Sequence, residues 1–505
     1  MIPALTTGSG ATDALLVVAP LLAPLAAAAT AAVLRWRLAT GLVTIGAAGI
    51  ILATGITAAT RTIDGTALTI GDWLRVDALT ALMLIVIGAV GLIATCAGLG
   101  HLDGELERGH IDDTGAHLYS VLVPLFLAAM VLAVLANNLG LLWAAIEATT
   151  IVTAFLVGHR RTRAALEATW KYVIICSVGI ALAYLGTVLV HYAAQQAGVA
   201  EHGSLDWTQL SAHAEDLDPG VMRLAFALLV LGFGTKAGLV PLHSWLPDAH
   251  SQAPAPVSAL MSGVLLPVAV YALLRYRVIA MASISPGFVR ALLLTIALAS
   301  LLLAASLLIT QRDYKRLLAY SSIEHMALVI IGVAIGTRLA IAAALLQIVG
   351  HGISKATLFC GAGEILSRTG TTSIAEVRGL LTRAPVLGGA FALGLAALLG
   401  LPPFSLFISE IGLVRAGLTA GLGWAMAVML VLLLIVFVAI AVKASGMLFG
   451  EPTTQPRPTV RTVAALPFAT AAPIIAGLGV VATLGIVDWP LGPLLHSASL
   501  IAGTP

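Results

Sequence analysis

The residues from Ala425 to Val442 form an apolar run of 18 residues without a polar side chain. A run of that length is long enough for a helix to cross the hydrocarbon core of a bilayer. Hydrophobic residues make up 59% of the 505-residue chain and charged residues only 10%, too few to cover the surface of a soluble protein of this size. The sequence therefore predicts an all-α integral membrane protein with many spans.

Fourteen apolar segments are long enough to be transmembrane helices. They lie near residues 13–34, 38–59, 78–100, 118–136, 138–158, 171–192, 222–240, 254–280, 288–310, 319–336, 339–366, 386–414, 422–449 and 463–488. No positive residue precedes the first segment, whereas a cleavable signal peptide has a positive start. We therefore expect about 14 transmembrane helices, the first of which is retained.

Positive residues are unevenly distributed between the connections. Those after odd-numbered spans hold 15 Lys and Arg residues, those after even-numbered spans hold eight, and three lysines lie inside spans. The segments 159–171 and 311–316 carry the strongest bias, whereas three arginines within 275–290 oppose it. Because positive residues collect in cytoplasmic connections, the distribution predicts a cytoplasmic location for the odd connections and an outside location for both termini.

Two spans are interrupted by glycine and proline beside an ionisable residue. Lys236 lies in the seventh, within GFGTKAGLVPLHSWLPDAH (232–250), and Glu410 follows two prolines in the twelfth, within ALLGLPPFSLFISEIGL (397–413). Broken helices at corresponding places are typical of transporters built from inverted repeats. We therefore expect three N-terminal helices over 1–117, one five-helix repeat over 118–280, an inverted five-helix repeat over 288–449, and a last helix with a tail over 463–505.

Ionisable side chains inside the spans are candidates for ion transport, because inserting one at membrane depth costs at least about 2.5–3.5 kcal/mol. The candidates are three of the five lysines, Lys236, Lys355 and Lys443, the acids Glu147 and Glu410, and four nearby histidines, His243, His250, His325 and His351. A charge near a helix end can instead extend to the membrane surface, the alternative that Lys443 favours. An isolated histidine can be a hydrogen-bonded interior group.

The sequence contains no pattern for a metal ion, an iron–sulfur cluster or another cofactor. Cys96, Cys176 and Cys360 are far apart in apolar segments. The segment 101–117 is rich in histidine and acids but lacks metal-ligand spacing, and we interpret it as a solvated loop. We therefore expect no cofactor, no metal and no catalytic residue on this chain, and the absence of a basic run predicts no nucleic acid partner.

Three long motifs resemble one family of membrane proteins. They are GTKAGLVPLHSWLPDAHSQAPAPVSALMSGVLLPVAVYALLRY, YKRLLAYSSIEHMALVIIG and HGISKATLFCGAGEI. All three are similar to the antiporter-like, proton-pumping subunits of respiratory complex I, Mrp-type sodium/proton antiporters and membrane-bound hydrogenases, over roughly residues 118–415. The segments NNLGLLWAAIEATT and EATWKYVIICSVGIALAYLGT most resemble component F of hydrogenase-4-type and formate hydrogenlyase complexes.

The resemblance implies that protons move along a chain of side chains in the middle of the membrane. By position, Glu147 resembles a glutamate of span five, Lys236 its lysine partner, Lys355 a relay lysine of span eleven and Glu410 the exit residue. Pairing with Glu147 would stabilise charged Lys236, and separation would release a proton toward Lys355. The expected proton-translocation residues are Glu147, Lys236, His243, His325, His351, Lys355 and Glu410, with Lys171, Asp248 and His250 as secondary candidates.

The chain departs from the family at Pro267. Many members have a lysine or histidine in the middle of span eight, where this sequence reads GVLLPVAVY. Proline has no N–H, so the carbonyl of Gly263, four residues earlier, should lose its helical donor. We expect that carbonyl to hold water and His325 to be the titrating group between Lys236 and Lys355. The alternative is that His325 only packs between helices and water alone bridges the gap.

The sequence contains no electron carrier, so a partner or another ion gradient must drive a charge across the membrane. Together with this absence, the resemblance implies a proton-translocating, non-redox subunit of a hydrogenase-4-type or complex I-like oxidoreductase complex in a prokaryotic cell membrane. The expected partners are the lipid bilayer, other membrane subunits and peripheral redox subunits on the cytoplasmic side. The alternatives are an Mrp-type sodium/proton antiporter subunit and a non-pumping structural membrane arm.

Overall fold

The computed structural model describes residues 10–451, 467–487 and 491–503. Within these ranges, the first six spans are continuous helices. The six helices are α1 (Ala11–Leu34), α2 (Leu38–Thr62), α3 (Ala78–Glu107), α4 (Asp113–Leu135), α5 (Leu139–Val157) and α6 (Arg163–Gln196). An antiparallel hairpin of β1 (Leu68–Ile70) and β2 (Leu74–Val76) joins α2 to α3. The polar connection after α6 contains three short helices, η1 (Glu201–Gly203), α7 (Trp207–Ala212) and η2 (Ala214–Asp216).

The later spans include both predicted breaks. The seventh consists of α8 (Pro219–Lys236) and the short α9 (Trp245–Gln252). The eighth runs through α10 (Ala255–Leu260), the π-helical η3 (Met261–Leu265) and α11 (Leu266–Ser283). The remaining helices are α12 (Pro286–Thr310), α13 (Tyr314–Ile335), α14 (Arg338–Thr369), α15 (Leu380–Arg383), α16 (Pro385–Leu398), α17 (Ser405–Thr419), α18 (Gly423–Phe449), α19 (Phe468–Ile486) and α20 (Gly492–Ala502).

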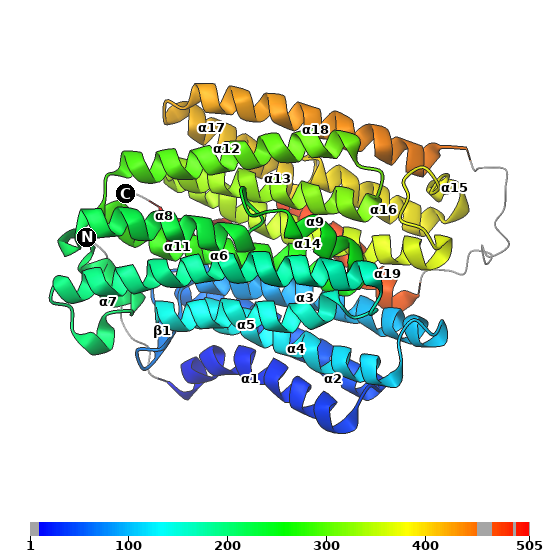
Figure 1. Ribbon diagram of the computed structural model, residues 1–505, viewed down its shortest axis with the longest axis horizontal. Coiled ribbons are helices and arrows are strands. Elements are labelled where there is room, and N and C mark those ends of the chain that lie inside the picture. Colours follow the sequence, from blue (N-terminus) through cyan, green and yellow to red (C-terminus); the bar gives the residue numbers. More distant parts are fainter. Residues whose placement is uncertain (1–9, 452–466, 488–490, 504–505) are drawn as a thin grey trace.

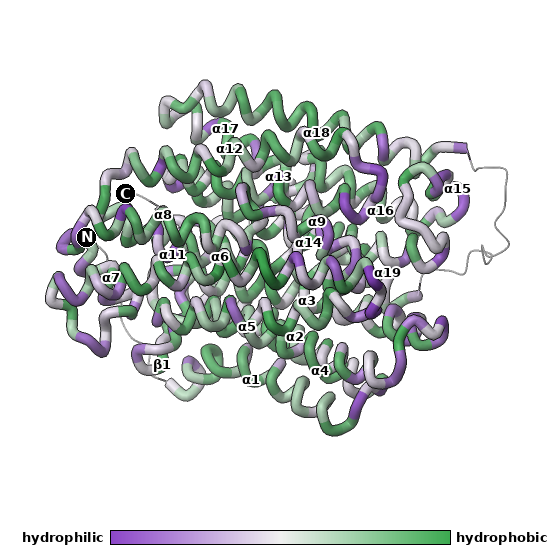
Figure 2. The backbone as a smooth tube through the Cα atoms, viewed as in Figure 1, coloured by the Kyte–Doolittle hydropathy of each residue, from purple (hydrophilic) through white to green (hydrophobic). Residues whose placement is uncertain are grey.

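The predicted all-α, multi-span class is confirmed. Thirteen helices within the described ranges are long and apolar enough to cross a membrane. The predicted twelfth span does not count among them, because its break divides it into α16 and α17 of 14 and 15 residues. Figure 1 shows the helices lying side by side, with α1 and α2 along one edge and α17 and α18 along the opposite edge. Hydrophilic residues gather mainly at the two ends of the bundle (Figure 2).

The break in the seventh span places Lys236 in the last turn of α8. Gly238 adopts a φ of +78°, a left-handed conformation that residues with a Cβ rarely adopt. The amides of Gly238 and Leu239 then donate to the carbonyls of Thr235, at 3.1 Å, and Gly234, at 2.8 Å. This pair of hydrogen bonds is a Schellman motif, which satisfies carbonyls at a helix end inside the bundle.

The break in the twelfth span has the same hydrogen-bond pattern. Gly400, two residues after the end of α16, adopts a φ of +60°. The amides of Gly400 and Leu401 donate to the carbonyls of Ala397, at 3.2 Å, and Ala396, at 3.1 Å. Both broken spans therefore end their first half with a Schellman motif, two residues after the last helical position.

Two lysines stabilise the C-terminal ends of helices. Lys443 of α18 donates from Nζ to the carbonyls of Leu308, at 2.8 Å, and Ile309, at 2.7 Å, near the end of α12. Lys315 of α13 is 2% exposed and donates to Ser251 and Ala253, both at 2.9 Å, at the end of α9. A cation is favourable at the negative end of a helix dipole. Lys443 therefore has a structural role.

The segment 101–117 differs from the predicted solvated loop. Residues 101–107 continue α3, and the Glu105 side chain is only 2% exposed. Arg160 donates to both carboxylate oxygens of Glu105, each at 2.7 Å. Burial lowers the pKa of the neighbouring His159 to about 4, so its ring is neutral at physiological pH. This end of the bundle is fixed by a buried ion pair that joins α3 to the α5–α6 connection.

Two of the three arginines that oppose the predicted orientation, Arg275 and Arg277, are buried structural residues. Arg275 of α11 forms two hydrogen bonds to the Asp77 carboxylate, each of 2.8 Å, and the Arg75 side chain approaches the same carboxylate at 3.2 Å. Arg277 donates to the carbonyl of Ala502 at 2.7 Å and caps α20. The charge of Arg275 is therefore paired with Asp77, whereas Arg277 is positioned by the end of α20.

Replacing Arg275 tests this cluster. Arg275→Ala leaves the buried Asp77 carboxylate with Arg75 as its charged partner. We therefore expect the free energy of unfolding to fall by about 3–5 kcal/mol. Thermal unfolding of the purified protein in detergent measures the effect. Arg290→Ala, at an exposed arginine on α12, is the matched control and should leave the midpoint unchanged. Equal midpoints for both variants would show that the Asp77 cluster contributes little.

Candidate proton-translocation site

Lys236 lies in a fully buried cluster between three helices. Its side chain is 0% exposed at the end of α8. Nζ donates to the hydroxyl of Thr150 on α5 at 2.8 Å and to the hydroxyl of Tyr172 on α6 at 3.2 Å. Nζ also lies 5.4 Å from the centre of the Tyr172 ring, within the range of a cation–π interaction. The cluster supplies neutral oxygen atoms and an aromatic ring to a cation at membrane depth.

Thr150 also connects Lys236 to the predicted acid. The Thr150 hydroxyl donates to Oε2 of the half-buried Glu147 at 3.0 Å, while it accepts from Lys236. Among the described residues, Lys236 and Glu147 form no direct ion pair in this conformation. The pair is instead linked through one hydroxyl. Thr150 was not predicted, although its position three residues after Glu147 places both side chains on one face of α5.

Aromatic packing fixes the Tyr172 hydroxyl beside Lys236. The Tyr172 ring packs at 5.0 Å from the ring of Trp245, the first residue of α9. The indole N–H of Trp245 donates to the carbonyl of Thr235 at 2.9 Å, and the Tyr172 hydroxyl contacts that of Thr153 at 2.5 Å. The two halves of the broken span are thus held together next to the lysine.

Lys355 lies in a second buried cluster on α14. Its side chain is 0% exposed, and Nζ donates to the carbonyl of Leu318 at 2.6 Å and to the hydroxyl of Ser321, both on α13. His351 lies one turn earlier on α14, and its ring centre is 5.0 Å from that of His325 on α13. The structure therefore brings the predicted residues Lys355, His351 and His325 together.

Span eight supplies a backbone carbonyl to this cluster. The amide of Leu266 donates to the carbonyl of Met261, which is the wider spacing of a π-helix. In that register the next donor would be Pro267, which has no N–H, so the carbonyl of Ser262 lacks a helical donor. Nε2 of His351 lies 3.2 Å from this carbonyl. A histidine is therefore the neighbour of the Ser262 carbonyl, one residue before the predicted free carbonyl of Gly263.

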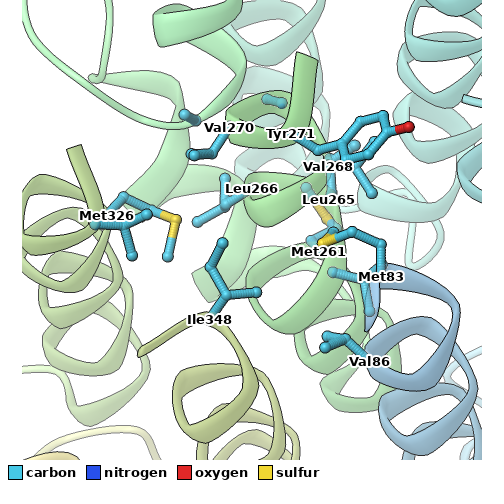
Figure 3. Packing of buried hydrophobic residues seen from close by; sticks show 14 of the residues in the cluster. Met83, Val86, Met261, Leu265, Leu266, Val268, Val270, Tyr271, Met326 and Ile348 are labelled. Atoms are coloured by element: carbon cyan, nitrogen blue, oxygen red, sulfur yellow. The ribbon is translucent and has the colours of Figure 1, made fainter. Parts of the chain in front are cut away.

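Apolar side chains surround the middle of span eight. Figure 3 shows Met326 and Ile348 pointing toward Leu266, with Met261 and Met83 packed on the other side of the span. Leu266, Met326 and Ile348 are all 0% exposed. In this conformation, a proton that moves from Lys236 to Lys355 must therefore cross an apolar region.

His325 is hydrogen-bonded to a side chain of α14. The amide Nε2 of Gln347 on α14 lies 2.9 Å from His325 Nδ1, and the Gln347 carbonyl oxygen accepts from the hydroxyl of Ser409 on α17. His325 Nε2 lies 3.4 Å from Oε2 of Glu324, a buried acid absent from the predicted set. Glu324 precedes His325 in the motif YSSIEHM, so its position inside a span was the available signal.

Glu410 lies on α17, beside the second break. It is half-buried and lines a groove of about 590 Å³ between α17 and α18, together with Arg415 and Thr419. The rest of the lining includes apolar side chains such as Leu430 and Leu433. Glu410 is therefore the candidate with access to the side of the bundle.

The secondary candidates lie in two places. Lys171 and Arg316 each approach the carboxylate of Asp248 at 3.1 Å, in a partly exposed network of α6, α9 and α13. The His250 ring is 0% exposed and stacks on Phe359 at 5.1 Å. Among the described residues, neither ring nitrogen of His250 has a hydrogen-bond partner.

His243 is separate from both lysine clusters. It is half-buried in the non-helical segment between α8 and α9. Within the described part of the chain, its Nδ1 has no hydrogen-bond partner. The structure therefore gives His243 no contact that links it to either lysine.

The family is identified by sequence comparison. The family described as NADH:quinone oxidoreductase/Mrp antiporter, transmembrane, matches residues 136–437. This match covers more than half of the chain and includes both lysine clusters. The chain therefore belongs to this antiporter family and is a multi-pass membrane protein, as the resemblance predicted.

Individual relatives agree with that assignment. A hydrogenase-4 component F homolog of Methylacidiphilum infernorum is 37% identical over 421 residues, 83% of this chain and 87% of its own length. Hydrogenase-4 component B of Escherichia coli is 31% identical over 349 residues, 67% of this chain and 50% of that protein. The predicted similarity to hydrogenase-4 component F is confirmed.

Two solved structures share the fold. A chain of the membrane-bound sulfane sulfur reductase, an archaeal respiratory membrane complex, matches with a TM-score of 0.83 and 22% identity over 97% of both chains. A chain of the Mrp complex from Dietzia sp. DQ12-45-1b matches with a TM-score of 0.82 and 23% identity over 98% of both chains. These matches confirm the arrangement of helices.

Thr150 offers a sharp test of the first cluster. Thr150→Val removes the hydroxyl that joins Lys236 to Glu147 but keeps the shape of the side chain, so we expect proton transport to fall by about tenfold or more, a barrier increase of about 1.4 kcal/mol. Thr149→Val is the matched control, because this buried hydroxyl donates to Ile146 of its own helix at 2.6 Å. Proton uptake by membrane vesicles measures both. Parental transport by Thr150→Val would exclude a role for the hydroxyl.

Proposed function

We propose that this chain is a proton-translocating, antiporter-like subunit of a membrane-bound respiratory or hydrogenase complex. The observation that supports the proposal most directly is the buried Lys236, linked through Thr150 to Glu147 at the end of a broken helix. A charged residue in this position is costly to bury, which favours a transport role over a packing role. Relatives named as hydrogenase-4 components support the type of complex.

Movement of Glu147 relative to Lys236 is the proposed switch. When Thr150 joins them, the negative charge of Glu147 stabilises the ammonium form of Lys236. When the link opens, the ammonium in its apolar surroundings is destabilised and releases its proton. The proton then reaches Lys355 across the apolar centre of span eight, which must admit water for this step.

The second cluster passes the proton on to Glu410. His250, His351 and His325 each have a buried ring nitrogen without a hydrogen-bond partner among the described residues. Buried polar atoms of this kind are commonly satisfied by water, so they define a path along which water can carry protons. Glu410, which lines the groove between α17 and α18, is the proposed exit.

The repeat organisation supports the same proposal. We assign residues 118–280 and 288–449 to two inverted repeats, preceded by 1–117 and followed by 463–505. The Schellman motifs at Gly238 and Gly400 occupy corresponding positions in the two units. Each unit would then provide one half of the route beside its own helix break.

Energy for transport would come from partner subunits. The chain matches components of redox complexes, and we propose contacts with other membrane subunits and with peripheral redox subunits on the cytoplasmic side. An Mrp-type sodium/proton antiporter subunit is the second candidate, favoured by the fold shared with the Mrp complex. Proton transport that requires sodium would support the second candidate, whereas transport driven by a redox substrate without sodium would support the first.

Lys236→Ala tests the proposed function. We expect the variant complex to assemble but to lose proton translocation, because neither Glu147 nor Thr150 can replace the amine. Lys443→Ala is the matched control, since this lysine caps α12 and should affect stability rather than transport. Redox-driven acidification by proteoliposomes that contain the purified complex measures both. Near-parental pumping by Lys236→Ala would instead support a structural membrane arm.

The orientation follows from the positive-residue bias. We propose that the α5–α6 connection with Arg160, Arg161 and Arg163 is cytoplasmic and that both termini are outside. In a background without Cys96, Cys176 and Cys360, single cysteines at Arg161 and at the exposed Glu201 should react with membrane-impermeant reagents from opposite sides. Labelling of both from the same side would contradict this topology.

A further inference from the structure

Glu324 is a buried carboxylate without the partners that other buried acids have. Its side chain is 4% exposed in the middle of α13. Glu105 is neutralised by two hydrogen bonds from Arg160, and Glu364 of α14 approaches Arg368 at 3.5 Å. Glu324 contacts only the ring of His325, at 3.4 Å, among the basic groups of the described residues. Burial of an unpaired carboxylate is costly, so structural stability does not explain it.

The neighbouring histidine is held in a defined orientation toward this acid. The Gln347 amide donates to His325 Nδ1 at 2.9 Å, so a neutral His325 carries its proton on Nε2. Nε2 is the nitrogen that lies 3.4 Å from Glu324 Oε2. Among the described residues Nε2 forms no hydrogen bond, so its N–H lies near the carboxylate without donating to it, and Gln347 and Ser409 position the ring from α14 and α17.

Glu324 lies on the helix against which both ends of the second half of the route are packed. Lys355 lies on α14 and Glu410 on α17. Both helices pack against α13, and His351 faces His325 from α14. No direct ion pair joins Glu324 to Lys355 within the described residues, so a proton must cross a gap between them.

We propose that Glu324 is a proton-binding relay residue between Lys355 and Glu410, a role that rests on the proposed function. In the first step the Lys355 ammonium loses a proton and the Glu324 carboxylate gains it, which leaves a neutral amine and a carboxylic acid. In the second step the acid gives the proton to the Glu410 carboxylate and becomes anionic again. The Ser321 hydroxyl, which contacts Lys355, and water carry the proton across the gaps. His325 is a positioning residue for Glu324 in this scheme.

The test is the neutral variant Glu324→Gln in the assembled complex. We expect redox-driven proton translocation in proteoliposomes to fall by about tenfold or more, a barrier increase of about 1.4 kcal/mol, since the amide keeps the size of the side chain but cannot carry a proton. Glu324→Asp keeps a carboxyl group and should restore part of the transport with a shifted pH profile. Glu364→Gln, an acid on the neighbouring helix outside the proposed route, is the matched control and should pump at the parental rate.

Two readouts separate this inference from a structural role and from the proposed function. Infrared difference spectroscopy of the parent should contain a protonated-carboxyl band that disappears in Glu324→Gln. Parental pumping by Glu324→Gln overturns the relay and leaves the proposed function intact, whereas a parental complex that moves no protons overturns the proposed function. If Glu324→Gln does not assemble, Glu324→Asp decides: a parental rate and pH profile would overturn the relay.

Discussion

The proposed site depends on the hydrogen bond from Lys236 to Thr150, which stabilises an ammonium group that is fully buried. An ammonium group at membrane depth needs oxygen partners, and a direct carboxylate partner would hold its charge too firmly for release. Thr150 provides an intermediate arrangement, since its hydroxyl accepts from the lysine at 2.8 Å and donates to Glu147 at 3.0 Å. Three features place this hydroxyl beside the lysine: the helix break at Gly238, the aromatic contact of Tyr172 and the packing of α5.

The five lysines of the chain divide into two groups by their contacts. Lys171 lies in a partly exposed ion-pair network, and Lys315 and Lys443 cap the ends of α9 and α12. Only Lys236 and Lys355 are 0% exposed and neither cap a helix nor join an ion-pair network. Each donates to a hydroxyl group on a neighbouring helix. Helix capping thus accounts for Lys443, whose place near a span end had already favoured a role outside transport.

Sequence patterns predicted the spans and both breaks, because apolar length and glycine–proline interruptions are local features. They identified Lys236 and Lys355 from the cost of burial. They did not identify Thr150 or Gln347, since uncharged polar residues are common in membrane helices and only contacts between distant segments distinguish these two. The carbonyl at Ser262 was missed because the π-helical register near Pro267 depends on packing between span eight and α14. Glu324 was not among the predicted residues, because His325, the next residue of the same motif, was the one selected as a titrating group.

The protonation state of Lys236 tests the central claim most directly. Because the chain has five lysines, selective ¹⁵N labelling gives few side-chain signals, and solid-state NMR distinguishes ammonium from amine nitrogen. We expect a charged Lys236 in the parent and a neutral Lys236 in Glu147→Gln at the same pH, with Lys443 charged in both. A charged Lys236 in both proteins would contradict the control of Lys236 by Glu147 through Thr150.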